Sequence, residues 1–166
     1  MSDEKAPEIL EELMEYEIPE NEDRVVAIDR ISRTVKGGRR IRFRALVVVG
    51  NRAGKVGVGL AKGNDVQTAI AKAKNEANKS MITVPMHNGT IHHDVDYTFE
   101  KTKVILRPAP EGHSIIAGNS VRAVVELAGI KNIVSKALGS PNQINTATAT
   151  YMALKTLAES PYRRSK

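Results

Sequence analysis

The sequence contains no cysteine and no tryptophan, and only two phenylalanines and four tyrosines. Without cysteine the chain can form no disulfide framework, no thiol nucleophile and no thiolate-ligated zinc site, which is most compatible with a reducing cytoplasm. So few aromatic residues also argue against a stacking surface for single-stranded bases. No apolar run approaches the ~20 residues that span a bilayer, and the N-terminus is acidic, so we expect no membrane partner and no secretory signal.

What the 166 residues do have is an uneven distribution of charge around a formal net charge of +6. Residues 1–23 hold ten carboxylates and one lysine, which gives −9. The other 143 residues hold 24 Lys and Arg against nine Asp and Glu, which gives +15. A folded part this basic points to a polyanion. Nucleic acid is favoured over a membrane surface because no basic amphipathic helix with an aromatic apolar face is present.

The most basic stretch is RISRTVKGGRRIRFR, residues 30–44, with seven basic residues and no acidic one. Gly37 and Gly38 predict the tip of a hairpin. After the tip, basic and apolar residues alternate with the period of a half-buried strand, although such a run is also typical of an ordinary solvated face. The pattern predicts a solvent row of Arg40, Arg42 and Arg44 and a core row of Ile41, Phe43, Ala45, Val47 and Val49. Phe43→Ala is therefore expected to cost ~3 kcal/mol or more through a core cavity.

Turn residues and periodicity divide the rest into two modules. In the first, strands over 24–35, 40–49 and from 55 onward precede a helix, with Asn64 as N-cap and Gln67 three residues later. Gly57 and Gly59 share one face of the third strand, so a helix or a nucleic-acid backbone can approach closely there. The buried side of the helix is predicted to be Val66, Ile70, Ala73 and Ala77.

The second module is predicted to contain strands over 95–99, 103–107 and 132–137 and helices over 120–128 and 142–158. The last helix is predicted to bury Ile144, Ala147, Tyr151, Leu154 and Ala158. We therefore predict an α+β fold of two small domains, β-β-β-α followed by β-α-β-α. The expected divisions are an acidic extension at 1–23, an RNA-binding domain at 24–88, a C-terminal β-α domain at 89–160 and a basic tail at 161–166.

Motifs for catalysis or cofactors fail on spacing. The segment GNRAGKVGVG has three residues, not four, between Gly50 and Gly54-Lys55, so it is no P-loop, and it lacks the third glycine of a dinucleotide fingerprint. The serine in GHSII lacks the glycine of a nucleophile elbow. The segment HHDVD favours an exposed polar connection over a metal site. We expect no enzyme activity, no cofactor and no metal.

Phosphate binding is the chemistry that remains. Arginine can fork onto phosphate oxygens, and glycine lets backbone amides come near them. Since aromatic residues are scarce, recognition of folded or double-stranded RNA by shape is favoured. The residues predicted to bind RNA are Arg30, Arg33, Lys36, Gly37, Gly38, Arg39, Arg40, Arg42, Arg44, Arg52, Lys55 and Lys62.

The run GRRIRFRALVVVGNRAGKVGVGLAKGNDVQTAI, residues 38–70, resembles the signature of the bacterial-type family of small-subunit ribosomal protein five. The resemblance continues through SRTVKGG, HNGT, RPAPEG, IIAG, VRAVVELAGI and SKALGS, so it covers about residues 24–157. It implies an N-terminal domain similar to double-stranded RNA-binding domains and a C-terminal domain shared with a translocation factor. It also implies a structural role in the small ribosomal subunit, in the cytoplasm, with binding to small-subunit ribosomal RNA and support of assembly and accuracy.

The same resemblance implies a place near the point where messenger RNA enters, in contact with ribosomal proteins four and eight. Residues 32–40 would reach toward the neck RNA, where spectinomycin binds, and Gly118, Asn119 and Arg122 would lie toward protein four. Three residues depart from the family pattern: Ser114 and Asn119 replace glycines, and Thr148 replaces an arginine. A free-standing double-stranded-RNA-binding regulator remains the alternative, and an RNA-modifying or nucleotide-dependent enzyme is the poorer third reading.

Overall fold

The computed structural model describes residues 21–159, so the predicted acidic extension and basic tail lie almost wholly outside the described residues. The first sheet has the order β1 (Glu22–Val35), β2 (Gly38–Gly50), β3 (Lys55–Gly63) and β4 (Ile82–Thr83). The second has the order β7 (Val95–Phe99), β8 (Thr102–Pro108), β10 (Ile133–Gly139) and β9 (Ile115–Ile116). The helices are α2 (Val66–Lys79), α3 (Asn119–Ala128) and α4 (Gln143–Glu159), and β5 (Met86–His87) pairs with β6 (Thr90–Ile91) between the sheets.

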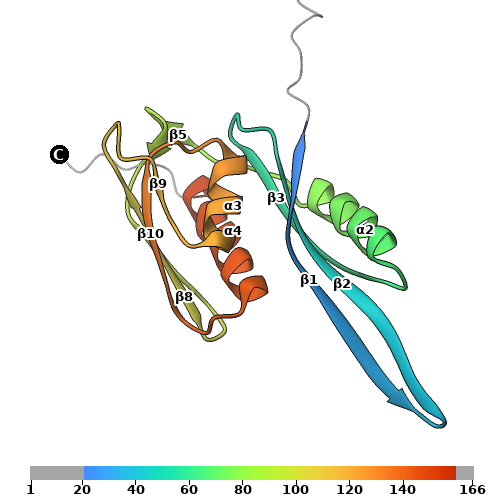
Figure 1. Cartoon of the computed structure of the whole chain (residues 1–166). Helices are drawn as coiled ribbons and strands as arrows, with labels where there is room; N and C mark the ends of the chain where they lie inside the picture. Colours follow the sequence, from blue (N-terminus) through green and yellow to red (C-terminus); the bar gives the residue numbers. More distant parts are fainter. Residues whose placement is uncertain (1–20, 160–166) are drawn as a thin grey trace, which may run out of the picture.

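The elements form four layers: α2, the first sheet, the helices α3 and α4, and the second sheet (Figure 1). The hairpin predicted at Gly37-Gly38 is confirmed, since β1 pairs antiparallel with β2. Strand β3 pairs antiparallel with β2, and β7 with β8. Only the two-residue β9 runs parallel to its neighbour β10. The predicted α+β fold of two small domains is confirmed.

Helix α2 packs closely against β3 because the facing residues of both elements have small side chains or none. A side chain added at Gly57 or Gly59 would overlap the backbone carbonyl oxygen of Ala77 or Ala73. The bare strand face predicted from these glycines is therefore covered by the helix, not by nucleic acid. The helix turns only its alanines fully inward, namely Ala69, Ala73 and Ala77.

The predicted start of α2 is one residue out, and the predicted buried side is confirmed at Ala73 and Ala77 but not at Val66 and Ile70. Asp65, not Asn64, is the N-cap, and its backbone N–H donates to Thr68 Oγ1 at 3.2 Å rather than pairing with Gln67. The alanines pack inward because only they fit against the glycines of β3, so Val66 and Ile70 are left half-buried at the margin of the interface.

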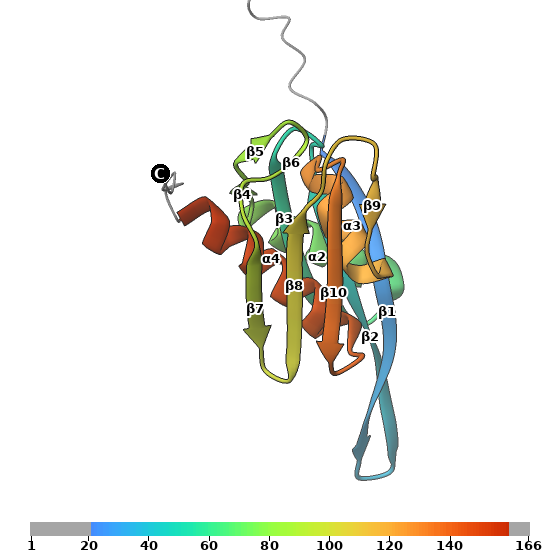
Figure 2. The same cartoon turned by 90° about the vertical axis from the view of Figure 1, so that its left-hand side faces the viewer.

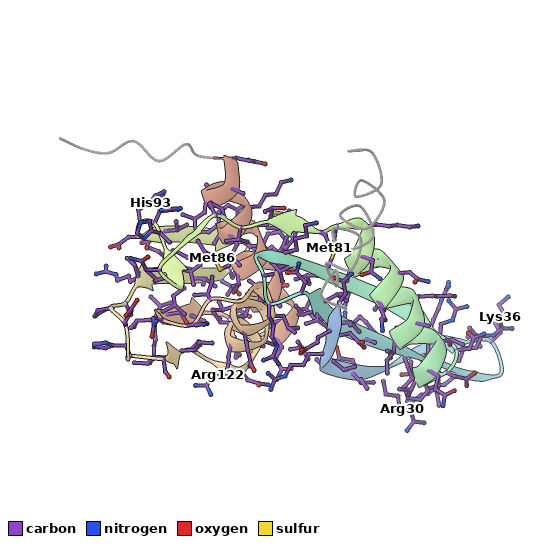
Figure 3. All side chains as sticks on the ribbon, turned by 90° about the horizontal axis from the view of Figure 1, so that it is seen from above. Arg30, Lys36, Met81, Met86, His93 and Arg122 are labelled. Carbon is purple, nitrogen blue, oxygen red and sulfur yellow. The ribbon has the colours of Figure 1, made fainter. Side chains whose placement is uncertain are left out.

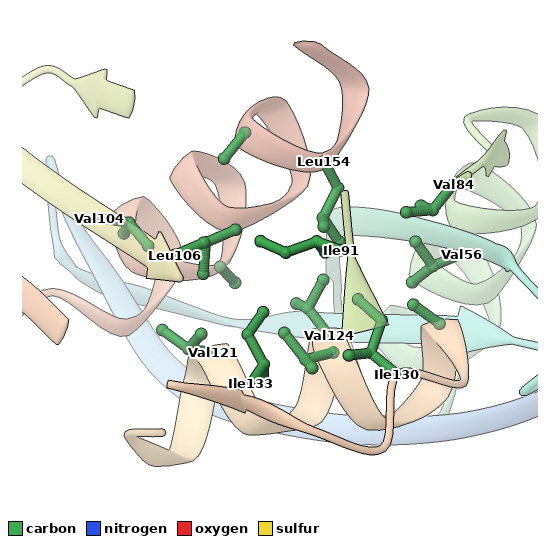
Figure 4. Packing of buried hydrophobic residues seen from close by; sticks show 14 of the residues in the cluster. Val56, Val84, Ile91, Val104, Leu106, Val121, Val124, Ile130, Ile133 and Leu154 are labelled. Atoms are coloured by element: carbon green, nitrogen blue, oxygen red, sulfur yellow. The ribbon is translucent and has the colours of Figure 1, made fainter. Parts of the chain in front are cut away.

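The predicted half-buried character of β2 is wrong over residues 45–50, where both faces of the strand are buried. Leu46 and Val48 lie in line with the arginines, yet they join a core made mainly by the second domain, because α3 covers that face. Figure 4 shows Val56 and Val84 of the first domain in the same cluster as Val124 and Leu154 of the second. The two domains therefore share the larger hydrophobic cluster, while the inner face of α2 packs on β2 in a separate, smaller one.

Helix α4 lies between the two sheets and is buried on more sides than one stripe predicts. Ala147 and Leu154 are buried as expected, but Ala158 is exposed and the predicted Ile144 and Tyr151 are half-buried. The hydroxyl of Tyr151 donates to the Ser80 carbonyl oxygen at 2.6 Å, which ties α4 to the end of α2, and burial raises the pKa of this phenol. Thr146 and Thr150 are buried and satisfied by carbonyls one turn earlier.

The predicted core row on β2 also ends sooner than expected. Ile41 is 43% exposed and Phe43 only half-buried, because the hairpin extends beyond the end of α2 (Figure 1). We now expect Phe43→Ala to cost about 1–2 kcal/mol, below the range for a fully buried phenylalanine, since the truncated ring leaves an opening to solvent and no closed cavity. Urea unfolding followed by circular dichroism measures this cost, and a loss above about 3 kcal/mol would show that the ring is a core residue after all.

Candidate nucleic-acid interface

The hairpin of β1 and β2 is the most protruding feature of the described chain (Figures 1 and 2). The two strands stay paired from Glu22↔Gly50 out to Val35↔Gly38, with one irregularity between Val25 and Ala27. Lys36 and Gly37 form the two-residue tip, where Gly37 has φ +90°, a conformation that strongly favours glycine. In Figure 3 Lys36 lies at the far end of this hairpin, away from the body of the molecule. The tip is therefore free to enter a partner.

Strand register collects five cations on one face of the sheet, which we call the arginine face. Side chains opposite one another in an antiparallel pair project to the same side. Arg33 lies opposite Arg40, and Lys62 of β3 lies opposite Arg44. The predicted row of Arg40, Arg42 and Arg44 is thus widened on both sides. The arginine face consists of Arg33, Arg40, Arg42, Arg44 and Lys62.

Most of these cations have no internal counter-charge. Arg44 is paired with Asp29 at 2.6 Å, but the other four make no ion pair with any residue in 21–159. Like charges directly opposite each other, as Arg33 and Arg40 are, destabilise a strand pair. An arrangement that weakens the free protein but concentrates positive charge is typical of a site for an anionic ligand.

The arginine face is hollowed. Arg33, Arg40, Arg42 and Lys62 line a groove of about 590 Å³, together with apolar side chains such as Ile31. A second hollow continues toward the start of α2 and brings Lys72 beside Arg42 and Lys62. Lys72 is not among the RNA-binding residues predicted from the sequence, and the packing of α2 on the sheet shows that it extends the arginine face. Cations line both hollows, and Asp65 is the one carboxylate among the lining residues, so a phosphate chain has a largely basic path here.

The other predicted RNA-binding residues are not all part of this group. Arg30 and Arg39 lie opposite Phe43 and Thr34, hence on the reverse face of the hairpin. Lys55 begins β3 and Lys62 lies next to its last residue, so about 23 Å of extended chain separates them. Arg30, Arg39 and Lys55 are exposed and make no ion pair within the described part of the chain.

Arg52 lies at the junction of the two domains. Its guanidinium is 2.9 Å from Glu22 and 3.9 Å from Glu126, and its backbone N–H donates to the Leu127 carbonyl oxygen at 2.9 Å. Arg24 also binds Glu126, at 2.9 Å. To bind RNA, Arg52 and Arg44 would have to exchange a carboxylate for a phosphate.

The residues predicted to face a protein partner lie at the start of α3. Gly118 is the N-cap, Asn119 begins the helix, and Arg122 donates to the Ile115 carbonyl oxygen at 3.0 Å while remaining exposed. Nearby Ser114 has φ +60°, a left-handed conformation that glycine adopts without strain, and its N–H is held by Asn132 at 3.1 Å. The chain thus keeps a glycine-type backbone at one of its departures from the family pattern.

Residues 21–159 contain neither a metal-binding cluster nor a membrane-spanning helix. No three or more His, Asp or Glu side chains there are arranged to hold a metal ion. No helix in the same range is long and apolar enough to cross a membrane.

The fold and the hairpin define a class: small, basic, two-domain α+β proteins that carry unpaired positive charge on a protruding arm. Residues 21–85 match the family described as "Ribosomal protein S5, N-terminal domain", and residues 97–161 match "Ribosomal protein S5, C-terminal domain". These matches cover most of the chain. The chain belongs to the ribosomal protein S5 family, a family of structural proteins of the ribosome.

Two curated relatives agree with this placement. The chain is 52% identical over 138 residues to "Small ribosomal subunit protein uS5" of Rubrobacter xylanophilus, an alignment that covers 83% of this chain and 69% of the relative. It is 47% identical over 152 residues to the protein of the same name from Thermotoga neapolitana, covering 92% of this chain and 85% of the relative. The resemblance read from the sequence is confirmed.

Proposed function

We propose that this chain is a structural constituent of the small ribosomal subunit that binds small-subunit ribosomal RNA through the hairpin of β1 and β2. One observation carries the proposal: Arg33, Arg40 and Arg42 share a hollowed face and have no counter-charge among the described residues. No carboxylate among the described residues neutralises these three arginines, so phosphate oxygens of RNA are suitable ligands for them. The role is non-enzymatic, and no cofactor takes part.

In this proposal the tip and the two faces of the hairpin have different tasks. The tip, Lys36 and Gly37, enters folded RNA, where Gly37 and the adjoining Gly38 leave room for the backbone to approach phosphates. The arginine face then lies along the sugar–phosphate chain. Arg30, Arg39 and Lys55 supply further contacts from other directions, and Arg44 and Arg52 join only after leaving their carboxylate partners.

The family membership supports finer proposals about surroundings. The chain would sit in the cytoplasm as part of the ribosome, near the point where messenger RNA enters, and would support assembly and accuracy. The start of α3, at Gly118, Asn119 and Arg122, would contact ribosomal protein four, and the body would also contact protein eight. The divisions we propose are those predicted from the sequence: an acidic extension at 1–23, an RNA-binding domain at 24–88, a C-terminal β-α domain at 89–160 and a basic tail at 161–166.

Binding to small-subunit ribosomal RNA should weaken steeply with salt. If about six phosphates are engaged, the logarithm of the association constant should fall against the logarithm of salt concentration with a slope near −5, because each neutralised phosphate releases a counterion. Filter binding or fluorescence anisotropy between 50 and 300 mM salt, roughly the range in which this effect is measured, gives the slope. A slope near zero would contradict binding through the cationic hairpin.

A further inference from the structure

The groove on the arginine face is apolar as well as cationic. Its cations are Arg33, Lys36, Arg40, Arg42 and Lys62. Ile31 and Val35 also line it, one on each side of Arg33 along β1, and Val35 is 37% exposed. Phosphate binding uses the cations but not these two apolar side chains. A ligand that carries both negative charge and apolar groups therefore fits the groove more fully than phosphate alone.

The acidic stretch that precedes β1 has this mixed composition. Residues 1–20 hold eight carboxylates and one lysine, which gives −7. Within it, the run EILEELMEYE, residues 8–17, combines five glutamates with five apolar or aromatic residues. The run therefore matches the groove in two respects, since its carboxylates suit the arginines and its apolar residues suit Ile31 and Val35.

The described end of the acidic stretch already pairs with cations of this chain. Glu22 lies 2.9 Å from the guanidinium of Arg52, and Asp23 lies 2.7 Å from the ammonium of Lys74. The third carboxylate of β1, that of Asp29, accepts from Arg44 at 2.6 Å on the arginine face itself. Every carboxylate of β1 thus neutralises a cation of the first domain, and the same chemistry is open to the carboxylates that precede the strand.

The run is also long enough to reach the groove. In Figure 1 β1 extends from the body of the molecule toward the hairpin tip. Ile31 lies nine residues after Glu22, which is about 30 Å along an extended strand. A chain spans at most about 3.3–3.6 Å per residue. Residues 8–13 are nine or more residues before Glu22, so they can fold back as far as Ile31.

We propose that residues 8–17 bind in the groove of the arginine face when RNA is absent. Their glutamates pair with Arg33, Arg40 and Arg42, and their apolar side chains cover Ile31 and Val35. The segment is thus a carboxylate competitor of phosphate that is tied to its own target. The inference rests on the proposed function in one respect, because it takes the arginine face to be the RNA site.

The tether makes weak contacts sufficient. A segment joined by a short linker is held at an effective concentration on the order of millimolar, so it occupies the groove without the affinity that a separate peptide needs. If it covers the groove about nine-tenths of the time, the affinity for RNA falls about tenfold. Non-specific RNA complexes, with dissociation constants of roughly 1–100 μM, are then largely lost, whereas a much tighter target still displaces the segment.

Deletion of residues 1–20 tests whether the groove is occupied. At about 50 mM salt, the truncated chain should bind a short RNA duplex of unrelated sequence about tenfold more tightly than the full chain, and the gain should shrink as salt rises. Its thermal midpoint should stay near that of the full chain, since Glu22 and Asp23 are kept. Anisotropy titrations measure the affinities.

The same deletion in a chain with Arg33, Arg40 and Arg42 changed to glutamine is the control. Without these arginines the segment has no site on the groove, so the gain on deletion should fall below about twofold. A gain of the same size in both backgrounds would show that the acidic segment repels RNA from a distance. That result would overturn the inference.

A second variant keeps every charge and removes the apolar groups. It carries serine at the four positions Ile9, Leu10, Leu13 and Met14. This chain should bind the unrelated duplex about threefold more tightly than the unmodified one, because the segment loses its contacts with Ile31 and Val35. An affinity equal to that of the unmodified chain would overturn binding in the groove.

A photo-reactive benzoylphenylalanine introduced at position 13 locates the segment directly. Irradiation of the full chain should give an adduct within the same molecule to residues 31–42, and excess small-subunit ribosomal RNA should abolish it. An adduct elsewhere, or with another copy of the chain, would contradict the inference and leave the RNA-binding proposal intact. Conversely, the proposed function alone fails if truncation gives the predicted gain but small-subunit RNA binds no better than the unrelated duplex.

Discussion

Replacing Arg33, Arg40 and Arg42 together by glutamine should lower the affinity for small-subunit ribosomal RNA about 100-fold or more at low salt. Each side chain is expected to make a charge-assisted contact with phosphate, worth about 1.5–3 kcal/mol when lost from a shielded site and less when exposed. The salt slope should become less steep by about three, since three counterions fewer are released. Anisotropy titrations at several salt concentrations measure both quantities.

The same triple variant should fold at least as well as the original. Removing the like charges of Arg33 and Arg40, which lie opposite each other, relieves repulsion in the strand pair. The matched control is Lys103, Lys136 and Lys155 changed to glutamine, which removes equal charge from exposed positions of the second domain. If the control weakens RNA binding as much as the hairpin variant, net charge and not the arginine face is responsible.

Gly59→Ala should destabilise the protein by about 3 kcal/mol, at the upper end for overpacking, because there is no room for the added carbon. Its position would overlap the Ala73 carbonyl oxygen and come within 2.6 Å of the Ala77 amide nitrogen. Backbone atoms inside a helix cannot turn aside as a side chain can. The helix must therefore move off the sheet, which urea unfolding at constant pH should record as a lower midpoint.

Gly118→Ala provides the control for that measurement. The chemical change is identical, but no atom lies within 4 Å of the new carbon and the residue has φ −65°. Its cost should stay below about 1 kcal/mol, the difference between glycine and alanine at an N-cap. Equal stability of Gly59→Ala and the unmodified chain would show that α2 is not packed against β3 as described.

The sequence predicts the hairpin well because its signals are local. Alternation from Arg40 onward and the glycine pair fix the strand, the turn and the face that the arginines share. The burial of that same face beyond Ala45 depends on the second domain, which lies far away in the sequence. A signal for it exists: five consecutive apolar residues, 45–49, are typical of a strand covered on both sides.

The register of α2 shows where periodicity stops being informative. Alanines and isoleucine recur at helical spacing on two adjacent stripes, so the pattern alone permits either Ile70 or Ala69 to face the sheet. Gly57 and Gly59 determine which stripe faces the sheet, because the helix backbone lies so close to these glycines that only alanine side chains fit between them. Likewise, Lys72 lies beside the arginine face only because of tertiary packing, which periodicity does not show. The ion pairs of Arg52 with Glu22 and Glu126 also depend on tertiary structure, because these residues are far apart in the sequence.

Sedimentation of a cell lysate tests the central claim most directly. On a sucrose gradient, the chain should be found in the fractions of the small ribosomal subunit and of whole ribosomes, and should remain with the small subunit when the subunits are separated. Detection of the chain only in the slowly sedimenting fractions, free or bound to other RNA, would contradict the account and favour a free-standing RNA-binding regulator.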